Sequence, residues 1–311
     1  MKLVTFETGG ERHIGAVLPG EATISDFTAA SGAVHFREML ALIDGGDRAL
    51  DEARVLTEAP KALVDLAAVR LLAPVPTPRQ MFDCLCYEKH LLQGARNSSL
   101  VTGGAPPIQI DEGKLPEVYR ELPVYYKCNR FSVVGTGETI VCPRYSTKLD
   151  YEMEFGVFLG KQVKNATVEA CADAIFGYCI FNDVSARDQQ MAEMRGMLGP
   201  SKGKDFDTGN VMGPWLVTKD EVADAQALTL TVYLNGVQVS SGSSADMMHT
   251  FPQIIAYSCR DETRHPGEFF GSGTVGGGCG LETGRLLEDG DVVEMEVTGL
   301  GRLGNRVMFQ A

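Results

Sequence analysis

The sequence predicts a mainly β, α+β fold in which a small α/β domain precedes a larger, strand-rich domain. Short runs of β-branched and aromatic residues, separated by turns, recur along most of the 311 residues, of which 35 are glycine. A proline-rich segment at residues 71–78 cannot continue a helix. We therefore place a boundary there and expect two domains, residues 1–73 and residues 78–311.

The first domain is expected to combine a hairpin with two helices. Residues 2–7 and 13–18 read as strands on either side of the turn residues Gly9 and Gly10. Apolar residues at helical spacing predict a helix over residues 36–43, and a second helix is expected over residues 47–56.

The second domain is expected to consist mainly of strands. Apolar runs predict strands at residues 139–142, 151–159, 177–182, 215–218, 228–234, 237–239, 291–297 and 302–309. Asn235 and Gly236 predict a type I′ turn. Helices are expected at residues 167–174, 185–194 and 248–258, the first capped by Thr167 and the last interrupted by Pro252. The polar residues 94–113 predict a long loop, either a lid or disordered.

Composition and charge exclude several classes of function. The net charge of −13 argues against nucleic acid and anionic membrane surfaces as partners. Neither a leader-like segment nor a run of about 18 apolar residues is visible, so we expect a cytoplasmic location. The eight cysteines lack Cys-x-x-Cys spacing, which predicts free buried thiols in a reducing compartment and not a structural zinc site.

The most informative segment places two carboxylates two residues apart in an apolar strand. Glu152 and Glu154 are separated by Met153 and followed by an apolar run. Residues two apart on a strand point to the same face, so these carboxylates repel each other and lose hydration beside the core. A bound hard cation is the simplest remedy, although an acidic pair on an edge strand is an equally simple explanation of this segment alone.

Other acids extend this candidate metal site. Asp183 follows a second apolar run about thirty residues later, and Asp83 is a lone charge in the apolar residues 81–86. Carboxylates without histidine or cysteine favour Mg²⁺, Mn²⁺ or Ca²⁺ over zinc or copper. His90 follows Asp83 by seven residues. Taken singly, Asp83 is more simply a salt-bridged acid and His90 a structural histidine.

Two glycine-containing segments complete the pattern. Residues 202–208 supply Lys202 and Lys204, although a solvated turn is the simpler explanation of this segment alone. Residues 271–278 contain five glycines but lack the Lys-Ser/Thr ending of a P-loop. We interpret them as a tight loop that brings backbone N–H groups close to a small ligand.

Together these segments resemble the fumarylacetoacetate hydrolase family. They occur in the family's order over most of residues 80–311, at residues 150–154, 182–190, 202–208 with Gly213-Pro214, and 271–276. The resemblance implies the family's mixed β-sandwich roll for the second domain and a homodimer. The first domain resembles the variable leading domain of this family only loosely.

The resemblance also implies roles for individual residues. The implied ligands of Mg²⁺ or Ca²⁺ are Asp83, Glu152, Glu154 and Asp183. The implied catalytic residues are His90, Glu282, which would orient His90, and Lys204. The implied substrate-binding residues are Tyr126, Lys127, Arg187, Gln190 and Thr274. One branch of the family has a glutamate three residues after its histidine, where this chain has Gln93, which favours a pair of His90 with Glu282.

These roles imply a metal-dependent hydrolase that cleaves a carbon–carbon bond in a small anionic 1,3-diketo acid, similar to fumarylacetoacetate or an acylpyruvate. The histidine–glutamate pair would activate water, and the metal would stabilise the enolate that leaves. A decarboxylase, isomerase or dehydratase of a 2-oxo acid or sugar acid is an alternative on the same scaffold. A non-catalytic metal- or ligand-binding protein is a second alternative, although it would not need His90.

Overall fold

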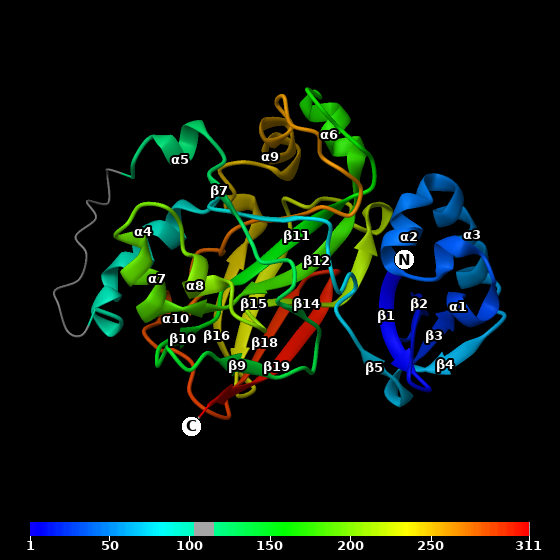
Figure 1. Ribbon diagram of the computed structural model, residues 1–311, viewed down its shortest axis with the longest axis horizontal. Helices are drawn as coiled ribbons and strands as arrows, with labels where there is room; N and C mark the ends of the chain where they lie inside the picture. The colour runs from blue at the N-terminus through cyan, green and yellow to red at the C-terminus, as the bar shows by residue number, and fades with distance from the viewer. Residues whose placement is uncertain (103–114, 311) are drawn as a thin grey trace.

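Two large β-sheets organise the fold, which a computed structural model describes for residues 1–102 and 115–310 (Figure 1). Among these residues the larger sheet has the strand order β4-β3-β2-β1-β14-β12-β11-β17-β6-β7, with β5 beside β1 and β8 beside β14. The smaller sheet has the order β16-β15-β18-β19-β9, and β10 pairs with β13. The architecture is a strand-rich α+β fold, as the sequence predicts.

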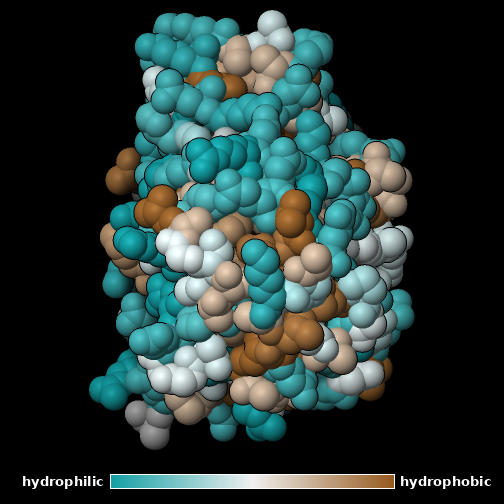
Figure 2. Space-filling model, turned by 90° about the vertical axis from the view of Figure 1, so that its right-hand side faces the viewer, coloured by the Kyte–Doolittle hydropathy of each residue, from teal (hydrophilic) through white to brown (hydrophobic). Residues whose placement is uncertain are grey.

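The N-terminal region contains β1 (Lys2–Thr8), β2 (Glu11–Val17), β3 (Thr23–Asp26), α1 (Phe27–Ala30), α2 (Met39–Asp44), α3 (Gly46–Glu58), β4 (Leu63–Asp65) and β5 (Arg70–Leu71). The predicted hairpin is confirmed as β1 and β2. Gly9 and Gly10 join these strands with φ angles of 59° and 84°, which suit glycine. The outward face of this region carries apolar side chains among polar ones (Figure 2), and its large exposed apolar residues include Val34, Val55 and Leu63.

The strands that follow are β6 (Met81–Cys84), β7 (Tyr125–Lys127), β8 (Val133–Val134), β9 (Ile140–Cys142), β10 (Leu149–Asp150), β11 (Met153–Leu159), β12 (Ile175–Asp183), β13 (Ser185–Ala186), β14 (Asn210–Thr218), β15 (Thr229–Leu234), β16 (Val237–Ser243), β17 (Phe269–Gly271), β18 (Val292–Val297) and β19 (Gly301–Phe309). The helices are α4 (Glu88–Arg96), α5 (Val118–Glu121), α6 (Val168–Ala174), α7 (Arg187–Met194), α8 (Ser201–Lys204), α9 (Phe251–Ser258) and α10 (Gly280–Thr283). Short 3₁₀ helices lie at η1 (Val34–Phe36), η2 (Leu66–Ala68), η3 (Ser98–Leu100), η4 (Lys219–Glu221) and η5 (Ser244–Asp246).

The central strands of the large sheet are buried on both faces. All residues of β11, β12 and β14 are buried. One face packs against the smaller sheet, where β12 contacts β18 and β19. On the other face Phe158, Phe181 and Leu216 share a hydrophobic cluster with residues of α2 and α3. Burial on both faces explains why these strands read as continuous apolar runs.

The first and second regions share one sheet. β1 pairs antiparallel with β14, with Leu3 opposite Leu216. The strands of the N-terminal region therefore extend the sheet of the second region across the predicted boundary at residues 71–78. The division into residues 1–73 and 78–311 stays a prediction.

Local signals predict several elements correctly and miss others. Thr167 caps α6 as predicted, and Asn235-Gly236 turns between β15 and β16 with positive φ at both residues. Pro252 does not interrupt α9. It lies in the first turn, where the missing N–H costs no helical hydrogen bond, so the helix begins at Phe251 and not at residue 248.

Two further boundaries differ from the prediction. α7 begins at Arg187 because Ser185 and Ala186 pair with β10 as β13. Within the predicted loop at residues 94–113, residues 94–96 complete α4 and residues 98–100 form η3, whereas residues 103–114 lie outside the described residues. No helix in the described parts of the chain has both the length and the apolar character needed to cross a membrane.

Candidate active site

Three buried carboxylates gather where β6, β11 and β12 run side by side with β17. Asp83, Glu154 and Asp183 each offer one oxygen, and these atoms all lie within 4.8 Å of one another. β17 lies between β6 and β11 and contributes Gly271. A Cβ atom at Gly271 would lie 2.5 Å from Asp83 Oδ1 and 3.1 Å from Glu154 Oε2. Only glycine therefore leaves room for the carboxylates at this point.

These three carboxylates lack enough positive charge around them. Burial, followed by the charge of Asp183, raises the pKa of Asp83 to about 8. Burial and the adjacent Asp83 raise the pKa of Glu154 well above its usual value. Asp83 Oδ1 and Asp183 Oδ1 are buried without a hydrogen-bond partner. Oxygen donors, excess negative charge and two free buried oxygens fit a hard divalent cation.

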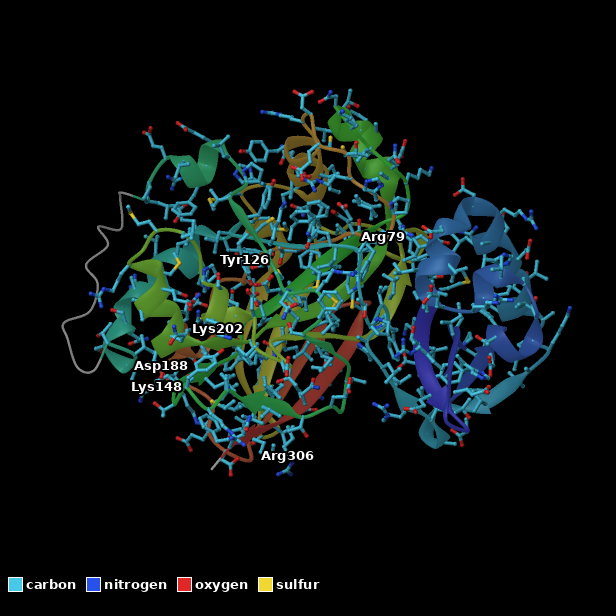
Figure 3. All side chains as sticks on the ribbon, in the orientation of Figure 1. Arg79, Tyr126, Lys148, Asp188, Lys202 and Arg306 are labelled. Atoms are coloured by element: carbon cyan, nitrogen blue, oxygen red, sulfur yellow. The ribbon has the colours of Figure 1, made fainter. Side chains whose placement is uncertain are left out.

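Glu154 and Asp183 are also held by neutral donors. The backbone N–H of Gly273 donates to Glu154 at 3.0 Å, and the Thr274 hydroxyl donates to the same carboxylate at 3.4 Å. The Tyr126 hydroxyl donates to Asp183 Oδ2 at 2.7 Å. Tyr126 belongs to β7, at the end of the large sheet that lies away from the N-terminal region (Figure 3). The structure therefore brings two of the predicted substrate-binding residues, Tyr126 and Thr274, to the carboxylates.

Glu152 has different partners from Glu154. Its Oε1 lies 2.7 Å from Arg187 Nη2, and its Oε2 accepts a hydrogen bond from Lys204 Nζ. Burial alone would raise the pKa of Glu152, but the charges of Arg187 and Lys204 outweigh burial and lower it. Lys204 Nζ also lies 2.6 Å from Asp183 Oδ2, so the lysine links Glu152 to the three carboxylates. Glu152 is thus next to the cluster but is neutralised by cations, and its role as a metal ligand stays a prediction.

The imidazole of His90 lies between Glu282 and Glu152. Its Nδ1 is 3.1 Å from Glu282 Oε2, and its Nε2 is 3.8 Å from Glu152 Oε1. The backbone N–H groups of Gly277 and Cys279 donate to Glu282 at 2.8 and 3.1 Å and hold that carboxylate in place. Burial lowers the pKa of His90, but the Glu282 carboxylate more than offsets burial, so the pKa is raised. The predicted partners therefore meet, although they are 192 positions apart in the chain.

Asp150 joins two parts of the site, and sequence reasoning gave it no role. Arg187 Nε donates to Asp150 Oδ2 at 2.8 Å, and Arg187 Nη1 donates to Gln190 at 2.9 Å. The backbone N–H groups of Gly280 and Leu281 donate to the same aspartate at 2.6 and 3.2 Å. Asp150 thus connects Arg187 to the start of α10, the helix that carries Glu282. The available signal was an aspartate two residues before the buried Glu-x-Glu pair.

Lys127 is the predicted site residue that the structure does not bring to the cluster. It follows Tyr126 on β7, and successive side chains on a strand point to opposite faces. Tyr126 points to the carboxylates, so Lys127 points away, with 57% of its side chain exposed and its Nζ 3.9 Å from Glu262. The family resemblance located the strand but not the side to which this lysine points.

Comparisons with known proteins agree with this fold. The family model for the C-terminal part of fumarylacetoacetate hydrolase matches residues 83–308. A fumarylacetoacetate hydrolase from psychrophilic Exiguobacterium antarcticum has 27% sequence identity and a TM-score of 0.76, with 100% of both chains covered. A maleylpyruvate hydrolase from Sphingobium sp. SYK-6, solved with manganese(II) and pyruvate, is 22% identical and has a TM-score of 0.74 with 100% of both chains covered, which shows the same fold.

One sequence relative has a higher sequence identity than these solved structures, but over a shorter part of the chain. A protein of Burkholderia cenocepacia that carries the provisional description hydrolase is 38% identical over 172 residues, or 55% of this chain. The match spans 60% of that relative's own length. The fold is therefore shared with these solved structures, and the match to this relative spans just over half of the chain.

Proposed function

This chain belongs to the fumarylacetoacetate hydrolase family, and we propose that it hydrolyses a carbon–carbon bond in a 1,3-diketo acid such as fumarylacetoacetate or an acylpyruvate. The observation that carries the proposal is the pairing of His90 with Glu282 at 3.1 Å beside three gathered carboxylates. An imidazole oriented by a carboxylate is the usual general base for activating water.

Asp83, Glu154 and Asp183 would hold a divalent cation, with Glu152 as the predicted fourth ligand. We propose Mg²⁺ as the ion, with Ca²⁺ or Mn²⁺ as the alternatives that an all-oxygen donor set admits. When bound, such an ion supplies a Lewis acid that polarises a substrate carbonyl and stabilises negative charge on oxygen.

His90 would act as the general base. Glu282 accepts a hydrogen bond from Nδ1–H, which fixes the tautomer and leaves the lone pair on Nε2. Nε2 would take a proton from water as the water oxygen attacks the substrate carbonyl. The bond between that carbonyl carbon and the adjacent CH₂ then breaks, and the CH₂ carbon receives a proton. One carboxylic acid and one methyl ketone result.

The buried cations would bind the anionic substrate and oppose developing negative charge. Lys204 and Arg187 are both buried and both contact Glu152, so they are held in fixed positions. We propose that Lys204 stabilises the developing oxyanion and that Arg187 with Gln190 binds the substrate carboxylate. Tyr126 and Thr274 would complete the substrate site.

The same residues would also serve decarboxylation, isomerisation or dehydration of a 2-oxo acid or sugar acid, so product analysis is the appropriate test. Purified protein with Mg²⁺ is incubated with fumarylacetoacetate, an acylpyruvate and oxaloacetate, and products are followed by NMR. We expect two fragments from a diketo acid, with one atom of solvent oxygen in the new carboxylate. Release of CO₂ from oxaloacetate without cleavage of either diketo acid would reject the proposal in favour of a decarboxylase.

The predicted homodimer is tested separately. Light scattering coupled to gel filtration is expected to give twice the chain mass of 33.6 kDa. A mass of 33.6 kDa at all concentrations would reject the dimer without affecting the proposed reaction.

A further inference from the structure

A second group of potential metal ligands lies on the other side of the His90 ring from Glu152. Cys279 Sγ is 3.9 Å from His90 Nδ1, and Glu282 Oε2 is 3.1 Å from the same nitrogen. One ligand atom from each of these three residues lies within 4.8 Å of the others. Nothing in the proposed reaction uses the Cys279 thiol.

The donor set differs in kind from that of the carboxylate cluster. Nitrogen, sulfur and oxygen donors together favour zinc over magnesium, whereas the three carboxylates favour hard cations. Zinc bonds of about 2.0–2.3 Å in a tetrahedron place neighbouring donors roughly 3.3–3.6 Å apart. The two distances of 3.1 and 3.9 Å lie on either side of that range, so small side-chain movements would complete the geometry.

Cys279 and Glu282 form a capping box at the start of α10, but helix capping does not require a thiol. Cys279 occupies the N-cap position of α10. Serine, threonine, aspartate and asparagine are the residues that stabilise this position, and cysteine is not one of them. A serine would fill nearly the same volume and cap the helix better, so the thiol itself calls for another explanation.

We propose that His90, Cys279 and Glu282 form a binding site for Zn²⁺, and that zinc bound there inhibits the enzyme. The thiol proton passes to solvent as the thiolate binds the ion. Nδ1 of His90 gives its lone pair to zinc, so the single proton of the neutral ring must lie on Nε2. Nε2 then has no lone pair with which to accept a proton from water. Inhibition rests on the proposed function, whereas zinc binding does not.

Cobalt(II) is the probe for this site because it replaces zinc and reports thiolate ligation. Full-length protein saturated with Mg²⁺ is titrated with Co²⁺. We expect a thiolate-to-cobalt charge-transfer band in the near ultraviolet that saturates at one ion per chain and disappears when Zn²⁺ is added. The band should be absent in Cys279→Ser. It should persist in Cys171→Ser, the matched control, because Cys171 is an equally buried thiol in α6.

Inhibition of turnover by Zn²⁺ is the second measurement. In Cys279→Ser the zinc concentration for half-inhibition should rise at least about 10-fold, since even partners one step beyond the metal ligands affect affinity by 10–100-fold. Melting temperatures in Mg²⁺ establish that each variant folds, and Cys279→Ala takes the place of the serine variant if that variant does not. Absence of the band in the unaltered protein, or its persistence without the Cys279 thiol, overturns the proposal. A band in a protein that cleaves no diketo acid would leave the zinc site intact and reject the proposed function instead.

Discussion

Glu152 and Glu154 lie two residues apart and are equally buried, yet their surroundings move their pKa values in opposite directions. Burial raises the pKa of both carboxylates, but Arg187 and Lys204 outweigh burial at Glu152 and lower its pKa, whereas Asp83 and Asp183 add to burial at Glu154. The site therefore has a cation-rich half around Glu152 and a cation-poor half around Asp83 and Glu154, with Asp183 between them in contact with Lys204. The difference shows that neighbouring side chains, and not residue type or burial, decide which carboxylates await an external cation.

The largest effect is expected at His90, which lies against the cation-rich half. His90→Gln removes the base but keeps a polar side chain, so turnover should fall by about 10²–10⁴-fold, the usual contribution of a general base. The affinity for Mn²⁺ should stay within about twofold, because Asp83, Glu154 and Asp183 are untouched. Steady-state kinetics and metal titration measure both quantities. Retention of full activity would remove His90 from the mechanism.

Replacing a carboxylate by an amide should change the free energy of unfolding in opposite directions in the two halves. Glu152→Gln removes the carboxylate that Arg187 and Lys204 share. Arg187 keeps Asp150 and Lys204 keeps Asp183, so the substitution should cost about 1–3 kcal/mol of unfolding free energy in metal-free protein. Asp83→Asn removes repulsion from the cation-poor half, so metal-free protein should become more stable. Urea unfolding after chelation measures both variants. Equal destabilisation by the two substitutions would mean that the halves are not electrostatically different.

Asp150→Asn tests the connection between Arg187 and α10. Asparagine keeps the volume of Asp150 but weakens its hold on Arg187, while Asp83, Glu154 and Asp183 keep their places. Turnover should fall about 10–100-fold, as for residues that orient groups in direct contact with the ligand. Metal affinity should not change, and neither should the acid limb of the pH–rate profile, because Glu282 stays in contact with His90. A loss of metal affinity equal to the loss of turnover would show a general structural role instead.

The stability of metal-free protein should decrease as pH rises. The pKa of Asp83 is about 8 in the folded protein against 3.8 for an ordinary aspartate, so the folded state holds the extra proton. Its contribution is complete below pH 3.8 and is lost as pH rises toward 8. The raised pKa values of Glu154 and Asp183 act in the same direction. Melting temperatures from pH 5 to 8.5 should fall without metal and vary less with saturating Mg²⁺. A rise with pH in metal-free protein would contradict the assignment.

The smallest effect is expected at Lys127. Its ammonium group is exposed and lies near Glu262, so Lys127→Ala should change kcat/KM by less than about twofold, as is usual for surface substitutions. Lys204→Ala serves as the contrasting variant, because that lysine is buried between Glu152 and Asp183. A large loss of substrate affinity in Lys127→Ala alone would restore the role that the family resemblance implied.

The secondary-structure elements and caps that depend on a local sequence pattern were predicted correctly. The strand at residues 151–159, the β1–β2 hairpin and the cap at Thr167 follow from periodicity and turn residues. The family resemblance predicts that His90 pairs with Glu282, and the two side chains are in contact in the structure. Their separation in the chain would otherwise have hidden this pair.

The remaining features depend on contacts between distant segments. The sequence placed Glu152 and Glu154 on one face, but the cations that distinguish them come from α7 and α8. The direction of Lys127 depends on the register of β7, and the role of Asp150 depends on α10 lying against Arg187. Neither the direction of the Lys127 side chain nor the role of Asp150 can be inferred from the residues next to it in the sequence.

The central claim is that Asp83, Glu154 and Asp183 jointly bind one divalent ion. Titration with Mn²⁺, followed by the electron paramagnetic resonance signal of the free ion, tests it most directly in the unaltered protein and in Asp83→Asn. We predict one tightly bound Mn²⁺ per chain and an affinity weaker by at least about 10-fold in the variant, since changes even one step beyond the ligands cost 10–100-fold. Equal affinity in the two proteins, or no binding in either, would contradict the claim.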